Sequence, residues 1–174
     1  DKKAEYFGYI KKTCLTLHNA SMLKKKKLPI HGAMVSITLN NGSIKNVAFL
    51  GDSGAGKSET IEALRIISED SIRDMDIVFD DMGSFYIEDG QVYAKGTEIG
   101  AFVRLDDLES GAAYRDMDRS IFFNPETTNA RVIIPVSTYK DITRGTKVDM
   151  FLYANNYDDK IGLHYFENSK EAKS

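Results

Sequence analysis

Cysteine and tryptophan are what this chain of 174 residues most clearly lacks, since Cys14 is its only cysteine and it has no tryptophan. A single cysteine excludes an intrachain disulfide and a thiolate zinc cluster. We expect Cys14 to be a small buried side chain. No apolar run approaches the ~20 residues that a bilayer span needs, and we expect no signal peptide. The sequence therefore predicts a cytoplasmic chain without a membrane partner.

A large excess of one charge is also missing, because 23 Lys and Arg side chains face 26 Asp and Glu, for a net charge of −3. This balance argues against nucleic acid as a partner. The hydrophobic content of 42% is typical of a globular domain with its own core. Because the first residue is Asp rather than Met, we expect a piece of a longer gene product. The oligomeric state stays open.

The N-terminal part of the chain predicts a helix followed by a basic segment. Apolar residues recur at helical spacing over residues 5–23. Four lysines at 24–27 then precede Pro29, which discourages continuation of the helix. We interpret the lysine run as a solvated segment, the alternative being that it steers an anionic substrate. The chain thus divides into a helical segment, 1–28, and a domain, 29–174.

The rest of the chain is rich in strand patterns. Turn signals stand at Asn40-Asn41-Gly42 and at Glu88-Asp89-Gly90. A helix with an apolar stripe is expected over 58–68. Many strands and few helices predict an α/β fold of α+β-like character with a mixed sheet. The predicted strands cover 32–39, 46–50, 76–79, 85–87, 91–95, 120–123, 131–136 and 148–154, the last as a buried strand.

Residues 51–58, G-D-S-G-A-G-K-S, match the phosphate-binding loop G-x-x-x-x-G-K-S/T at every fixed position. Glycines allow successive backbone N–H groups to turn inward around an anion, and the helix that follows adds its N-terminal amides. Lys57 would reach the β- and γ-phosphates, and the Ser58 hydroxyl would ligate Mg²⁺. The residues expected to contact the nucleotide are Gly51, Asp52, Ser53, Gly54, Ala55, Gly56, Lys57, Ser58 and Glu59.

Asp80 and Asp81 follow the strand expected over 76–79, where an acidic residue beside a phosphate loop would hold a metal ion. If the strand continued, the two carboxylates would point to opposite faces and take different roles. The alternative is a pair of turn residues at a strand end. Lys95 and Arg131 would clamp phosphate oxygens or a carboxylate, or form ordinary ion pairs with acids such as Glu98 or Glu126.

Several segments resemble one superfamily. Residues 30–35 (I-H-G-A-M-V), 51–60 and the Asp80-Asp81 pair resemble the catalytic core of bacterial HPr kinase/phosphorylase. Residues 93–95 (Y-A-K), 129–135 (N-A-R-V-I-I-P) and 148–154 resemble ATP-dependent phosphoenolpyruvate carboxykinase. The resemblance covers roughly Pro29 to Ala154. It implies a mixed β-sheet P-loop core like the C-terminal domain of the carboxykinase.

The resemblance also implies roles and cofactors. The expected activity is an ATP-dependent phosphotransferase or a carboxykinase-like lyase. An imidazole ligand suits Mn²⁺ better than Mg²⁺, so Mn²⁺ is an alternative to Mg²⁺. The implied catalytic residues are Asp80 as general base with Lys57, Arg131 and Lys95, and the implied metal ligands are Ser58, Asp81 and His31.

The acceptor stays open because the sequence departs from both families. The aspartate pair continues as Met82-Gly83 and not as the D-D-E-H-G of the carboxykinase. The partner is then a nucleotide, ATP or GTP, together with an unidentified phosphoryl acceptor or a small carboxylate. A module of the same fold that senses nucleotide without catalysis is the alternative function.

Overall fold

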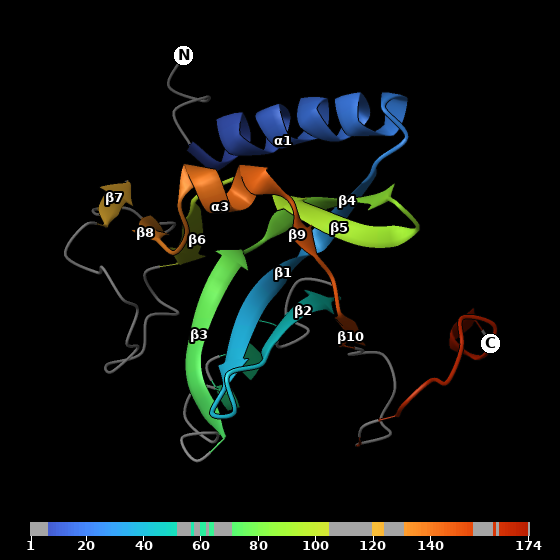
Figure 1. Ribbon diagram of the computed structural model, residues 1–174. Helices are drawn as coiled ribbons and strands as arrows, with labels where there is room; N and C mark the ends of the chain where they lie inside the picture. Colours follow the sequence, from blue (N-terminus) through green and yellow to red (C-terminus); the bar gives the residue numbers. More distant parts are fainter. Residues whose placement is uncertain are drawn as a thin grey trace.

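Strands dominate the computed structural model, which describes residues 7–51, 57, 60–61, 63–64, 71–104, 120–123, 131–154, 162 and 164–173 (Figure 1). In chain order the elements are α1 (Phe7–Lys24), β1 (Leu28–Leu39), β2 (Ile44–Leu50), β3 (Ile72–Phe79), β4 (Met82–Glu88), β5 (Gln91–Gly96), β6 (Gly100–Arg104), β7 (Ile121–Phe123), β8 (Arg131–Pro135), α3 (Tyr139–Arg144), β9 (Thr146–Lys147), β10 (Met150–Tyr153) and a short 3₁₀ turn, Glu171–Lys173.

The strands form two sheets. The larger has the order β10-β2-β1-β4-β5-β9, with β3 also paired to β1, and the smaller has the order β6-β8-β7. Strand β10 is parallel to β2, whereas the other pairings are antiparallel. The molecule is thus a mixed α/β fold with a mixed sheet, as the sequence predicts in general terms.

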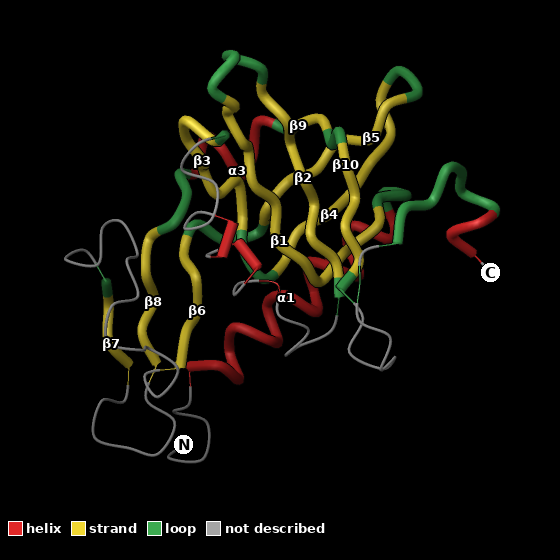
Figure 2. Tube along the Cα trace, turned by 90° about the horizontal axis from the view of Figure 1, so that it is seen from below, coloured by secondary structure: helices red, strands yellow, loops and turns green. Residues whose placement is uncertain are grey.

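Strand β1 organises the larger sheet, because one of its edges is shared by two successive strands. Its first residues pair with β4, where His31 lies opposite Met82, and its later residues pair with β3, where Met34 lies opposite Phe79. The turn between β3 and β4 therefore lies beside residues 32 and 33 of β1. Gly32 is required there, since a Cβ atom would lie 2.5 Å from the carbonyl oxygen of Phe49. Figure 2 shows β1 and β2 side by side in this sheet.

Two apolar clusters lie on opposite faces of β1, because successive side chains of a strand alternate. Met34 packs with Phe79, Ala94 and Ile142 of α3. Val35 belongs to the other cluster, to which Ile61 of the helical segment after the phosphate loop also contributes. The buried residues of this cluster are Ala33, Val35, Ile37, Val47, Phe49, Ile61 and Met75. The helix α1 lies along the top of the molecule in Figure 1. In the described part of the chain, no helix is long and apolar enough to cross a membrane.

Three expectations differ from the structure. Strand β10 is real but not buried, because it pairs with β2 alone and leaves Phe151 and Tyr153 exposed. Cys14 is exposed on α1 rather than buried. The sequence also does not predict β6, β9 or α3. The helix α3 has six residues and begins after Thr138, whose side chain caps it. Such a helix is too short to show a helical period.

Candidate functional site

The structure describes both ends of the predicted phosphate loop. Gly51 follows directly after β2, and Lys57 has helical backbone. The Lys57 ammonium is buried and donates a hydrogen bond to the carbonyl oxygen of Gly51 at 2.8 Å. A buried ammonium needs such acceptors because its removal from water is costly. The lysine thus reaches back to the first residue of the loop. The other predicted nucleotide contacts lie outside the described residues: Asp52, Ser53, Gly54, Ala55, Gly56, Ser58 and Glu59.

Asp80 and Asp81 form the turn between β3 and β4, so the strand does not continue through them. Asp81 has a left-handed backbone with φ of 72°, which is uncommon outside glycine and asparagine or aspartate. The Asp81 N–H donates to Asp80 Oδ1 at 2.9 Å, and the Asp81 carbonyl accepts from Gly32 N–H at 2.9 Å. The two carboxylates differ because a turn separates them, not because a strand alternates.

The Asp81 carboxylate is bound on both oxygens. His31 Nε2 lies 3.1 Å from Oδ1, and Lys11 Nζ of α1 lies 2.8 Å from Oδ2. The hydrogen bond from His31 and the bond and charge of Lys11 hold the pKa of Asp81 well below its usual range, against the effect of burial. Asp81 is therefore ionised at neutral pH.

The Asp80 carboxyl meets the opposite conditions. Burial raises its pKa above the ordinary value of 3.8, and the charge of Asp81 adds to this, while Lys11 and Lys57 oppose it. Gly51, which holds the Lys57 ammonium, follows Leu50, and Leu50 lies opposite Gly32, whose N–H donates to Asp81. The start of the phosphate loop and the aspartate turn therefore flank the same residue of β1. A buried carboxyl of raised pKa beside an ionised one is a common arrangement for an acid or base in catalysis.

Glu98 is a third carboxyl at this site. It follows β5, and its Oε2 lies 3.1 Å from Lys11 Nζ. Its Oε1 is buried and has no hydrogen-bond partner among the described residues. Burial raises the pKa of Glu98 in spite of Lys11. Lys11 thus bridges Asp81 and Glu98.

Two predicted metal ligands are adjacent in the structure. His31 Nε2 and Asp81 Oδ1 are 3.1 Å apart, and neighbouring ligands of an octahedral ion bound at about 2.1 Å are separated by about 3 Å. An ion bound there would take the place of the hydrogen that His31 Nε2 donates to Asp81. The carboxylate oxygen suits both Mg²⁺ and Mn²⁺, whereas the imidazole nitrogen suits Mn²⁺ better. The third predicted ligand, Ser58, lies outside the described residues. The described residues contain no group of three His, Cys, Asp or Glu side chains that could hold a metal ion.

Arg131 and Lys95 occupy different places. The Arg131 guanidinium lies 5.8 Å from the centre of the Phe102 ring, and Lys11 Nζ lies 4.7 Å from the same ring. Arg131 and Lys11 therefore lie beside the same aromatic ring. The Lys95 ammonium lies 5.7 Å from the ring centre of Tyr86, further along β4 and β5.

Sequence reasoning missed Lys11, although it lies on the helix that was predicted. Lys11 is one of two adjacent lysines on that helix, and it has only 10% of its side chain exposed. Lys12 beside it is exposed. Only the docking of α1 near Asp81 distinguishes the two, and no local pattern encodes that docking. Glu98 was considered as a partner of Lys95 or Arg131, whereas the structure pairs it with Lys11.

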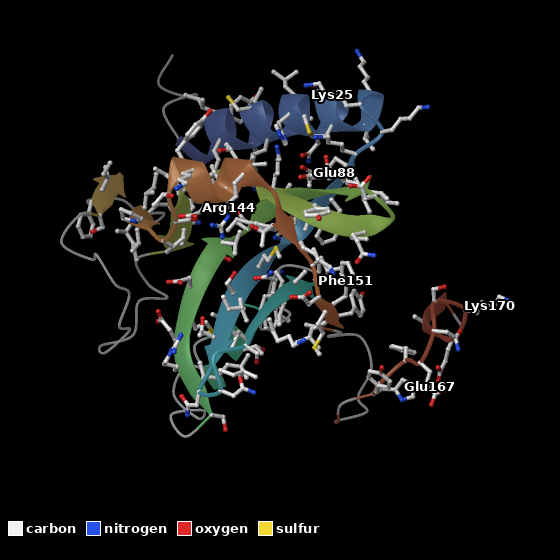
Figure 3. The ribbon with its side chains drawn as sticks, in the orientation of Figure 1. Lys25, Glu88, Arg144, Phe151, Glu167 and Lys170 are labelled. Atoms are coloured by element: carbon white, nitrogen blue, oxygen red, sulfur yellow. The ribbon has the colours of Figure 1, made fainter. Side chains whose placement is uncertain are left out.

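A separate polar hollow of about 380 Å³ lies between β3 and the segment that leads into α3. Asp76, Ser137, Asp141 and Arg144 contribute to its lining, and Figure 3 shows Arg144 there on α3. None of its lining residues belongs to the cluster of Lys11, His31, Lys57, Asp80, Asp81 and Glu98.

No family matches the sequence in a search of known protein families, and no curated protein matches it either.

Proposed function

We propose that this chain is an ATP-binding, metal-dependent phosphoryl-transfer domain, similar to the nucleotide-binding core of phosphoenolpyruvate carboxykinase and HPr kinase. One observation carries the proposal. The buried ammonium of Lys57, the buried carboxyl of Asp80 and the pair of His31 with Asp81 gather where β1, β2 and the β3–β4 turn meet.

Binding of the nucleotide falls to the loop after β2. Backbone amides of residues 51–59 would surround the phosphates, and Lys57 would exchange its bond with the Gly51 carbonyl for phosphate oxygens. His31, Asp81 and Ser58 would hold Mg²⁺ or Mn²⁺. An ion bound there supplies positive charge that neutralises the phosphate oxygens.

Asp80 is the group best suited to act as a base. As its carboxylate it would take the proton of an acceptor hydroxyl, the freed oxygen would bond to the γ-phosphorus, and ADP would leave with the electrons of the broken bond. The raised pKa of Asp80 favours this role, because a base works best when its pKa approaches the operating pH. Arg131 would neutralise charge on the transferred group, and Lys95 would reach it only by swinging away from Tyr86.

The decisive experiment measures transfer of labelled γ-phosphate from ATP with Mg²⁺ or Mn²⁺. Hydroxyl-bearing proteins and small carboxylates such as oxaloacetate would be offered as acceptors. Transfer that is lost in Asp80→Asn and kept in Asp141→Asn, a carboxylate outside the site, supports the proposal. Binding of ATP with no transfer to any acceptor would instead establish the nucleotide-sensing alternative, and absence of ATP binding would overturn both.

A further inference from the structure

Positive charge is concentrated in one part of the chain. Residues 6–51 contain no Asp or Glu, although the whole chain has 26 acidic residues and a net charge of −3. An asymmetry of this kind favours an anionic partner for the basic part. The lysines of this region are Lys11, Lys12, Lys24, Lys25, Lys26, Lys27 and Lys45.

The helix α1 in this region presents apolar side chains to solvent. Tyr9 and Leu17 are 68% and 67% exposed, and Ile10 and Leu23 are each more than half exposed. Lys11 on the inner side is largely buried, and His18 and Asn19 each bury a polar atom. The outward side of α1 therefore mixes exposed apolar side chains with lysines and threonines, whereas the exposed side of an ordinary surface helix is mainly polar. Figure 1 shows this helix along one side of the molecule, with the sheets on its other side.

Lysines stand at the carboxyl end of the same helix. Lys26 has a left-handed backbone with φ of 57°, and its N–H bonds to Leu23 while that of Lys27 bonds to Met22. Glycine is favoured at this position of a helix end, so the lysine stands where its backbone conformation is uncommon. Lys24, Lys25 and Lys26 are exposed, and within the described residues no carboxylate pairs with them. Figure 3 shows Lys25 at this end of α1.

Two other charged side chains lie near this end of the helix. Lys27 turns inward, with its ammonium 4.5 Å from the ring centre of Tyr86. Glu88, which influences the pKa of Tyr86, lies on the hairpin below the helix in Figure 3. The outward side of α1 thus combines exposed Tyr, Ile and Leu with exposed Lys12, Lys24, Lys25 and Lys26.

We propose that the outward side of α1 docks on an anionic phospholipid bilayer. Leu and Ile side chains would enter the acyl boundary, Tyr9 would lie at the headgroup level, and the lysines would contact anionic headgroups. The combination favours a bilayer over nucleic acid, which offers phosphates but no apolar layer for Ile10, Leu17 and Leu23. Peripheral docking needs no spanning segment. The expectation of no membrane partner rested on the lack of such a segment, so that expectation does not argue against docking on a membrane surface. The proposal goes beyond phosphoryl transfer and does not depend on it.

Co-sedimentation with vesicles tests the proposal. The chain is expected to bind vesicles of phosphatidylcholine with phosphatidylserine and to bind vesicles of phosphatidylcholine alone only weakly. Replacing Lys24, Lys25 and Lys26 together by Glu should weaken binding by at least roughly a hundredfold. The matched control replaces the exposed lysines Lys45, Lys140 and Lys170 by Glu, which changes the net charge equally and should have a much smaller effect.

A second variant separates the apolar contribution from charge. Leu17→Ser leaves every charge in place and should weaken binding roughly tenfold. Circular dichroism of each variant checks that α1 is retained. The proposal is overturned if wild-type protein does not sediment with the anionic vesicles, if phosphatidylcholine alone binds it equally well, or if the variants on α1 and the control behave alike.

Discussion

At the scale of single residues, Asp80 and Asp81 show how two identical neighbours acquire different chemistry. Asp81 accepts from His31 and Lys11 and stays ionised, whereas Asp80 is buried and has a raised pKa. The left-handed backbone at Asp81 turns the two carboxylates into these different surroundings. Sequence reasoning predicted the difference, and predicted Asp81 as the metal ligand, but assigned the cause to strand alternation.

The two aspartates should therefore respond differently to Asn. Asp80→Asn is expected to keep Mg-ATP binding near normal and slow transfer by roughly 10²–10⁴-fold, as loss of a general base does. Asp81→Asn is expected to weaken metal affinity and turnover together, because it removes the charge beside His31. Metal titration and single-turnover kinetics distinguish the two. Normal binding and normal turnover in both variants would mean that the pair is only a turn.

Lys57 leads to a prediction about affinity. Lys57→Met keeps the apolar stem of this buried side chain and removes the ammonium, which should weaken both ATP and ADP by roughly 10–100-fold, the effect of losing a charged hydrogen bond. Isothermal titration calorimetry measures this, with the exposed Lys140→Met as control. Unchanged affinity for both nucleotides would reject the phosphate site.

Acid sensitivity follows from Asp81. Because its pKa is lowered on folding, its contribution to stability is present above the ordinary value of 3.8 and is lost as the pH falls below that value. Asp80 and Glu98, with raised pKa values, act in the opposite direction. The free energy of unfolding should therefore fall less steeply below pH 3.8 in Asp81→Asn than in the wild type. Equal slopes in chemical denaturation would contradict this assignment.

At the scale of elements, Lys11 joins α1 to the site in the part of the chain that the structure describes. Lys11 bridges Asp81 at 2.8 Å and Glu98 at 3.1 Å, and its ammonium faces the Phe102 ring. Lys11 belongs to the predicted helical segment 1–28, and Asp81 and Glu98 belong to the predicted domain 29–174, so these ion pairs run between the two predicted parts. The site as described includes a residue of the N-terminal helix.

Removal of that bridge should loosen the helix. Lys11→Met leaves two carboxylates without their cation, and we expect a loss of about 2 kcal/mol, less than for a fully buried pair because Asp81 is partly exposed. The adjacent and exposed Lys12→Met is the control and should change stability by less than about 0.5 kcal/mol. Hydrogen exchange should show lower protection in α1 for Lys11→Met alone. Equal protection in both variants would mean that the ion pairs do not hold the helix.

Local sequence signals predicted the elements that local physics determines. The hairpin at Asp89 and Gly90, both with positive φ, and the turn at Gly42 are as expected, as are α1 and β2. The strand predicted over 32–39 is also present, but β1 begins earlier, at Leu28, so His31 lies within it. The phosphate loop motif lies after β2 and the aspartates after β3, as predicted. The partners of Lys11 and Glu98 and the exposed face of β10 depend on tertiary packing, which no short window of sequence contains.

At the scale of the whole molecule, β1 joins the parts of the site. It carries His31, pairs with the strand that leads into the phosphate loop, and pairs along its other edge with both strands that flank Asp80 and Asp81. A change in its register would move His31 away from Asp81, because a shift of one residue reverses every side chain of a strand.

The parallel pairing of β10 with β2 has a kinetic consequence. It places Met150 opposite Val47, and the Asn46 N–H donates to an Asp149 carboxylate oxygen 103 positions later in the chain. The hairpin of β1 and β2 closes over only a few residues, whereas the pairing with β10 must first close a long loop. We therefore expect β1 and β2 to form early and β10 to join late during refolding. Pulse-labelling hydrogen exchange should protect the amide of Val47 before that of Leu152.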